Sequence, residues 1–219
     1  MQALTLYTYF RSSAAFRVRI ALNLKGLAYE SKYIHLLKDG GQEKSAEYEQ
    51  INPQKLVPSL MDGDQVITQS LAIIEYLNEK YPEPSLLPED LIVRAQVRAM
   101  ALSIACDIHP LNNLRVTQYL DKALGVDEND RKKWIQHWVA EGFAAIENQL
   151  KKQDSSDYCF GNRVTMADLC LIPQVYNALR FDCDMTSYPR INRIYRQCMK
   201  QPEFVTASPE QQADCDINT

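Results

Sequence analysis

The fold of the first part of the chain is decided by residues 4–35, which read LTLYTYFRSSAAFRVRIALNLKGLAYESKYIH. Residues 4–9 alternate and are rich in β-forming side chains, which predicts a strand. Apolar side chains then recur at helical spacing from about residue 14 to residue 25, and Gly26 is expected to end this helix. Residues 29–35 are expected to form a second strand. A crossover of this length favours parallel strands, so the stretch predicts a β-α-β unit.

The residues that follow complete a small α/β domain. The expected elements are, in order, a short polar helix over 42–50, strands over 59–61 and 65–68, and a helix that Ser70 caps and that runs to about Tyr81. Asp62-Gly63-Asp64 between the two strands is typical of a hairpin turn. The order β-α-β-α-β-β-α is that of a thioredoxin-like domain, which we assign to residues 1–82.

The second part of the chain is predicted to be entirely helical. Pro82-Glu83-Pro84-Ser85 is typical of a linker. The clearest amphipathic pattern covers 131–152, and further helices are expected over 89–106, 111–123, 166–180 and 189–200. The polar tail after Pro202 is expected to be irregular. The predicted fold class is therefore α/β plus all-α, with an all-helical second domain over residues 88–219.

Composition and charge exclude several classes of function. The net charge is −4 and neither part is strongly basic, which argues against a nucleic-acid partner. No apolar run approaches membrane-spanning length, and the first residues lack the features of a signal peptide, so we expect a cytoplasmic protein without a membrane partner. The three histidines lack metal-site spacing and the six cysteines form no C-x-x-C pair, so we expect no metal.

Ser12-Ser13 stands where the first strand gives way to the first helix. The ordinary interpretation is a helix cap. The functional interpretation is an anion or thiolate site, because a helix N-terminus carries partial positive charge and a serine hydroxyl can donate a hydrogen bond. Both effects lower the pKa of a bound thiol.

Two further dipeptides allow both an ordinary and a functional interpretation. Val57-Pro58 precedes a strand and is ordinarily a turn, but a cis proline there would leave the backbone of Val57 free to pair with a peptide ligand. Gln69-Ser70 begins a helix and is ordinarily a cap, but the hydroxyl and the helix-start amides could capture a carboxylate. In contrast, Thr165-Met166-Ala167-Asp168 has the pattern of a capping box, which we interpret as structural.

These features occur in the order found in the glutathione S-transferases, and the chain resembles the zeta class of that family. The resemblance runs from Leu4 to about Met199 and rests on YFRSSAAFRVRIALNLKG (9–26), DGGQ (39–42), NPQKLVPSL (52–60), QSLAIIEYL (69–77), HPLNNLRV (109–116) and VTMADLCLIPQVYNALRF (164–181). One position departs from the class signature, which usually reads Ser-Ser-Cys, because Ala14 stands in the third place. The resemblance implies glutathione as cofactor and a homodimer.

The resemblance also implies roles for individual residues. Ser12 matches the catalytic serine, with Ser13 beside it. The implied glutathione contacts are Ser12, Ser13, Gln42, Val57, Pro58, Gln69, Ser70 and Asn113. The implied reaction is cis–trans isomerisation of maleylacetoacetate to fumarylacetoacetate, a step in tyrosine and phenylalanine breakdown. The candidates for holding the carboxylates of this dianionic substrate are Arg11, Arg180, Arg115 and His109, since guanidinium pairs bidentately with carboxylate.

Other functions on the same fold stay open at this point. Maleylpyruvate is a related substrate, and a general transferase would conjugate glutathione to electrophiles or haloacids. A non-catalytic binding protein is disfavoured because the serine, proline and Gln-Ser features are all retained. A glutaredoxin-like oxidoreductase is disfavoured because the first domain contains no cysteine.

Overall fold

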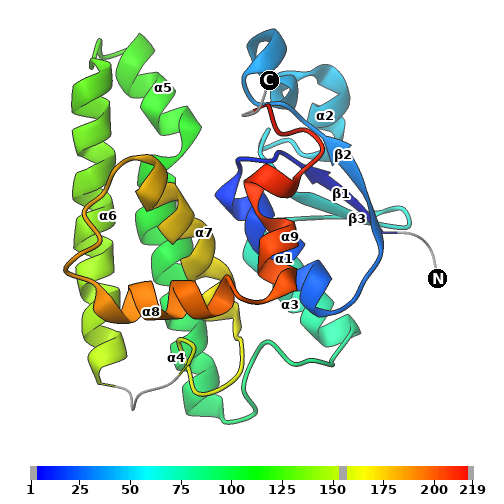
Figure 1. Cartoon of the computed structure of the whole chain (residues 1–219). Helices are drawn as coiled ribbons and strands as arrows, with labels where there is room; N and C mark the ends of the chain where they lie inside the picture. The colour runs from blue at the N-terminus through cyan, green and yellow to red at the C-terminus, as the bar shows by residue number, and fades with distance from the viewer. Residues whose placement is uncertain (1–3, 153–156, 217–219) are drawn as a thin grey trace. The chain divides into compact units, whose positions relative to one another are not determined.

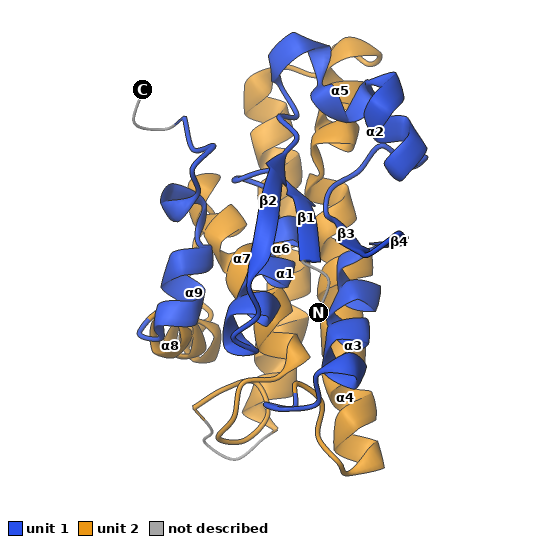
Figure 2. Ribbon diagram, turned by 90° about the vertical axis from the view of Figure 1, so that its right-hand side faces the viewer, with its two compact units in different colours: residues 1–85, 200–219 blue, residues 86–199 orange. Residues whose placement is uncertain are grey.

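The computed structural model describes residues 4–152 and 157–216, which form two compact units. Unit 1 contains residues 1–85 together with 200–219, and unit 2 contains residues 86–199 (Figures 1 and 2). The chain passes into unit 2 after Ser85, at the end of the expected linker. Residues 200–219 differ from the expectation, since they group with unit 1 rather than with the helical domain.

Unit 1 is built around a four-stranded sheet in the order β2-β1-β3-β4. Its elements are β1 (Leu4–Thr8), α1 (Ser13–Leu24), β2 (Tyr29–Tyr33), the short 3-10 helices η1 (Lys38–Gly40) and η2 (Gln42–Lys44), α2 (Ala46–Ile51), β3 (Ser59–Asp62), β4 (Gln65–Thr68), α3 (Ser70–Lys80), α9 (Pro202–Ala207) and η5 (Pro209–Gln211). β1 runs parallel to β2 and antiparallel to β3, which confirms the predicted β-α-β unit. All five residues of β1 are buried, as expected of a strand at the centre of the sheet.

The predicted irregular tail after Pro202 is wrong where the chain forms α9 and η5, whereas residues 212–216 have no regular helix or strand. Pro202 is the first residue of α9, a position where its missing N–H costs no hydrogen bond. α9 packs against α1, and Phe204 and Ala207 are buried in this contact (Figure 1). The polar composition of the segment concealed this docking, because only two of its side chains are needed to anchor it.

Unit 2 is entirely helical in the part of it that the structure describes. Its elements are α4 (Leu91–Leu102), the π-helical segment η3 (Ser103–Ile108), the 3-10 helix η4 (His109–Asn112), α5 (Leu114–Lys122), α6 (Glu128–Lys151), α7 (Met166–Arg180) and α8 (Pro189–Cys198). α7 lies at the centre and packs against α4 and α8. It begins with the predicted capping box between Thr165 and Asp168, which is confirmed.

The helix predicted over 89–106 is interrupted in the structure by η3. Two features explain the change of winding. Pro110 has no amide hydrogen and cannot continue a regular helix. The Ile108 side chain fills the space beside Gly142, where a built Cβ would lie only 2.2 Å from Ile108 Cδ1. The wider turn before His109 lets this isoleucine reach α6.

Candidate active site

Ser12 is the N-cap of α1 and also ends a tight turn. Its amide donates to the Tyr9 carbonyl at 3.0 Å, and its Oγ accepts from the Ala15 amide at 3.2 Å. Because the cap bond uses a lone pair of Oγ, the hydroxyl hydrogen remains available to an anion. The first turn, Ser13 to Phe16, contains no acidic residue that would neutralise the helix N-terminus. The geometry therefore suits a bound thiolate.

The next two positions complete this helix start. Ser13 is buried as the first residue of α1, whereas Ala14 is only half-buried. The position of the missing class cysteine is thus two residues after Ser12 and partly open. Neither residue alters the hydroxyl or the amides that the thiolate site requires.

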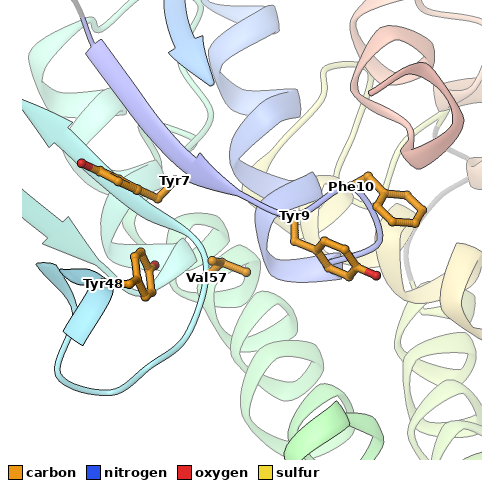
Figure 3. Packing of buried hydrophobic residues seen from close by; sticks show 5 residues of the cluster. All are labelled: Tyr7, Tyr9, Phe10, Tyr48 and Val57. Atoms are coloured by element: carbon orange, nitrogen blue, oxygen red, sulfur yellow. The ribbon is translucent and has the colours of Figure 1, made fainter. Parts of the chain in front are cut away.

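Val57 and Pro58 form the predicted cis peptide bond, which is confirmed. The preceding carbonyl of Leu56 accepts from the Tyr48 hydroxyl and from Asn52 Nδ2, both at 2.7 Å. Burial raises the pKa of Tyr48 to about 12, so its phenol stays protonated and can donate at neutral pH. By contrast, the backbone of Val57 has no hydrogen bond within the described residues. Figure 3 shows Val57 in the same apolar cluster as Tyr9, whose carbonyl begins the serine turn.

The prediction that Ser70 caps α3 is wrong, because the N-cap is Gln69. Gln69 has φ 69° and ψ 116°, and its side chain does not cap α3. Its side-chain Nε2 donates instead to Oε1 of Gln54. A non-glycine residue with positive φ costs about 1–3 kcal/mol, and such strain is often found at functional sites. The outcome is a helix start whose amides are not capped by a side chain.

Ser70 is the first residue of α3 and is buried. Its Oγ accepts from Arg17 Nη1 at 3.3 Å, which leaves its own hydrogen available to an anion. Arg17 is 1% exposed and brings a positive charge to the same helix start. Sequence reasoning missed Arg17, although a charged side chain in the otherwise apolar stretch of α1 is a signal that could have found it.

The side chain of Gln42 makes hydrogen bonds within the loop that follows β2. Its Oε1 accepts from the His35 amide at 2.9 Å, and its Nε2 donates to Asp39 at 3.1 Å. The side chain thus shapes the loop after β2, and its role as a glutathione contact stays a prediction.

Arg11 lies between Phe10 and the C-terminal segment. Its guanidinium carbon is 4.8 Å from the centre of the Phe10 ring, and Nη2 is 3.7 Å from a carboxylate oxygen of Asp216. The Arg11 and Asp216 side chains are 28% and 33% exposed, respectively, so the pair is reachable from solvent. A hydrogen bond from His35 is the main reason why the pKa of Asp216 is lowered, so this carboxylate is ionised at neutral pH.

The remaining predicted residues belong to unit 2. Asn113 is the N-cap of α5, where its Oδ1 accepts from the Arg115 amide at 3.0 Å. His109 is half-buried at the start of η4, and Arg115 is exposed on α5. Arg180 ends α7 and is exposed, with its guanidinium 4.4 Å from the centre of the Phe181 ring. Their roles toward cofactor or substrate stay predictions.

The donor set of unit 1 fits glutathione. A tripeptide thiol with two carboxylates needs a donor for the thiolate, a free backbone edge and an anion site. Ser12 has a hydroxyl that could donate to the thiolate, and Val57 has a free backbone edge. The uncapped start of α3, with Ser70 and Arg17, could bind a carboxylate. The fold and these three groups define a glutathione-using protein of thioredoxin-like type.

Comparison with known proteins agrees with this assignment. Residues 6–85 match the model of the glutathione S-transferase N-terminal domain, and residues 130–197 match that of the C-terminal domain. The chain belongs to the glutathione S-transferase family. Among the described residues, no helix is both long and apolar enough to span a membrane.

Several similar proteins carry the names of maleylacetoacetate or maleylpyruvate isomerases. A probable maleylacetoacetate isomerase of Vibrio cholerae is 51% identical over 214 residues, which cover 98% of this chain and 99% of the relative. The holo structure of maleyl pyruvate isomerase, described as a zeta-class enzyme, has a TM-score of 0.93 and 44% identity, and covers 96% and 99% of the two chains. A maleylacetoacetate isomerase from Methylobacterium extorquens AM1 with bound malonate and glutathione has a TM-score of 0.91 and 38% identity, and covers 95% and 97%.

Proposed function

We propose that this protein is a glutathione-dependent isomerase that converts maleylacetoacetate to fumarylacetoacetate. Similar proteins of that name and the start of α1 both support the proposal. The observation that carries it is Ser12, whose oxygen caps the helix while its hydrogen stays available to a thiolate. We further propose that the enzyme works in tyrosine and phenylalanine breakdown in the cytoplasm.

The residues of unit 1 have distinct tasks in this reaction. When bound, glutathione supplies a thiolate that adds reversibly to the cis double bond, so that rotation and elimination give the trans product. Ser12 donates to the thiolate sulfur and holds it ionised, helped by the N-terminus of α1. Ser70, Arg17 and the amides of α3 hold a carboxylate, and the backbone of Val57 pairs with the peptide. Ser13, Gln42, Pro58 and Gln69 complete the proposed contacts from unit 1, and Asn113 is the one proposed from unit 2.

The substrate carries two carboxylates, and we assign these to arginines. Arg11 and Arg180 are the first candidates, followed by Arg115 and His109. Arg180→Ala should raise the KM for the substrate and leave the glutathione affinity nearly unchanged. Arg180→Lys should not restore the KM fully, because an ammonium cannot make the bidentate pair. Equal losses of both affinities would show that Arg180 supports the fold instead.

Maleylpyruvate is the second candidate substrate. The TM-score of 0.93 to maleyl pyruvate isomerase and a 44% identical maleylpyruvate isomerase of Ralstonia sp. favour it. Both molecules offer a cis double bond beside a carboxylate, so the same machinery would serve. An absorbance assay of each substrate, with and without glutathione, separates the two. We expect faster, strictly glutathione-dependent isomerisation of maleylacetoacetate, and faster turnover of maleylpyruvate would reverse the assignment.

We also propose that the enzyme is a homodimer, on the ground of family resemblance. Its subunit mass is 25.1 kDa. Sedimentation at micromolar concentration should give a species of twice that mass. A single species at the subunit mass would refute the dimer and leave the reaction unaffected.

A further inference from the structure

Residues 202–216, which we term the C-terminal clasp, are held on unit 1 by both apolar and polar contacts. Asn23 Nδ2 in α1 donates to the Glu203 carbonyl and to Thr206 Oγ1, each at 3.0 Å. Cys215, near the end of the clasp, packs against the apolar cluster that contains Tyr9 and Phe10. Figure 3 shows these two cluster residues. The clasp therefore reaches from the far half of α1 to the turn that precedes Ser12.

Arg19 joins the clasp to this turn. It is 0% exposed, and its guanidinium donates hydrogen bonds both to the clasp and to the turn. Nε donates to the Ala207 carbonyl in α9 at 2.9 Å. Nη1 and Nη2 donate to the carbonyls of Tyr9 and Phe10 at 3.3 and 2.9 Å, and Nη1 also donates to Thr8 Oγ1 at 3.0 Å. One buried cation thus ties the clasp to three successive residues at the end of β1.

Asp214 holds the same turn from the other side. Its Oδ2 accepts from the Phe10 amide at 2.9 Å. The amide of Phe10 donates to Asp214 and its carbonyl accepts from Arg19, so side chains of the clasp and of α1 together fix both backbone groups of this residue. Burial raises the pKa of Asp214, and the Phe10 amide opposes that shift. Phe10 lies two residues before Ser12, so its position determines where the Ser12 hydroxyl points.

Asp216 holds the next residue of the turn, Arg11. It also accepts from His35 Nε2 at 3.1 Å. His35 Nδ1 accepts from the amides of Leu37 and Lys38 at 3.2 and 3.0 Å, which places the proton of neutral His35 on Nε2 and makes it the donor. Asp216 is therefore fixed by the loop after β2 while it contacts Arg11 Nη2.

We propose that the clasp is a working part of the active site, with Arg19, Asp214 and Asp216 as positioning residues. Arg19 and Asp214 fix the backbone that presents Ser12, and Asp216 orients the guanidinium of Arg11. The inference rests on the proposed function, in which Ser12 stabilises a thiolate and Arg11 receives a carboxylate. Preorganised geometry matters here because a misplacement of about 1 Å can cost roughly 100-fold in rate.

The test compares Asp214→Ala with Asp214→Asn and with Gln211→Ala, an exposed control in the same segment. The readouts are kcat, the pKa of the bound glutathione thiol and the dissociation constant of glutathione. Asp214→Ala should lower kcat by about tenfold and raise the thiol pKa, with a dissociation constant within about twofold of wild type. Asp214→Asn should recover most of both losses, since its amide oxygen can still accept from Phe10. Values for Asp214→Ala equal to those of Gln211→Ala would overturn the proposal.

Asp216→Ala provides a second variant, which leaves the hydrogen bonds of Arg19 and Asp214 intact but removes the acceptor of His35. It should raise the KM for the dicarboxylate at least threefold and leave the thiol pKa unchanged. A lower KM would mean that Asp216 competes with substrate for Arg11, which would overturn its positioning role. The thiol pKa also separates the two proposals. If wild type lowers this pKa without isomerase activity, the proposed function fails while the Asp214 comparison still decides the role of the clasp.

Discussion

The starts of α1 and α7 show how two similar helix N-termini serve different purposes. At α7, Asp168 is 0% exposed and accepts from the Thr165 amide, the Thr165 hydroxyl and the Cys159 amide, at 2.8, 2.9 and 2.8 Å. At α1, the capping oxygen of Ser12 leaves a hydrogen to donate, and no acid lies in the first turn. A helix start becomes a site for an external anion when the chain does not supply its own.

The start of α3 differs from that of α7 even more than the start of α1 does. It has no side-chain cap, its N-cap Gln69 has a positive φ, and Arg17 adds a buried positive charge. The start of α7 is thus stabilised by its own side chains, whereas the starts of α1 and α3 have hydrogen-bond donors that an external anion could use. Substitutions at these three helix starts should therefore affect stability, turnover and binding to different extents.

Asp168→Ala should destabilise the protein by about 3–5 kcal/mol, because buried donors at residues 159 and 165 lose their acceptor. The matched control is Asp127→Ala at the start of α6, where an exposed aspartate accepts from the Asp130 amide. That exposed cap should cost only about 1 kcal/mol. Urea unfolding of both variants measures the difference. Equal losses would contradict the structural role assigned to Asp168.

Ser12→Ala should lower turnover by about 100-fold, as expected for loss of one donor to a developing or bound anion. The variant should also raise the pKa of bound glutathione. Ser45→Ala is the control, because Ser45 caps α2 by accepting from the Tyr48 amide. Both variants lose a cap, so only a catalytic role separates their turnover. Unchanged activity in both Ser12→Ala and Ser13→Ala would remove the assignment.

Ser70→Ala should weaken glutathione binding by about tenfold, since a hydrogen bond to a charged group contributes about 1.5–3 kcal/mol before partial compensation by Arg17. Turnover at saturating glutathione should stay close to wild type, because Ser70 is assigned to the carboxylate and not to the sulfur. Calorimetric titration gives the affinity. An unchanged affinity would show that α3 does not hold the cofactor.

Ala14→Cys should have the smallest effect on rate, less than tenfold. The proposed thiolate site would use the Ser12 hydroxyl, which caps α1, and the amides of α1, and neither depends on residue 14. The new cysteine would lie at a helix start, where a low thiol pKa makes it sensitive to alkylating reagents. A rise of tenfold or more, about 1.4 kcal/mol in barrier, would mean that the class cysteine assists the chemistry.

The fold could be predicted from the sequence wherever periodicity or turn chemistry is strong. The β-α-β unit, the hairpin and the capping box at Thr165 follow from local patterns, and the structure has them. Ser70 was misassigned because serine is a preferred cap, whereas the true N-cap, Gln69, has a conformation that its type disfavours. Local preference cannot reveal a strained residue that the surrounding structure holds in place.

The site could be predicted only in its local parts. Ser12, Val57 and Ser70 belong to short motifs at element boundaries. Asp214 could not be found this way, since the bond from the Phe10 amide to Asp214 spans 204 positions of the chain. No periodicity links residues so far apart, and only tertiary packing of the clasp brings them together.

We propose above all that the start of α1 holds the sulfur of glutathione as a thiolate. A pH titration of the ultraviolet thiolate absorbance of glutathione bound to the wild-type protein measures the pKa of this thiol. We expect a pKa below that of free glutathione, and a shift back toward the free value in Ser12→Ala. A pKa for bound glutathione equal to that of the free thiol would contradict it.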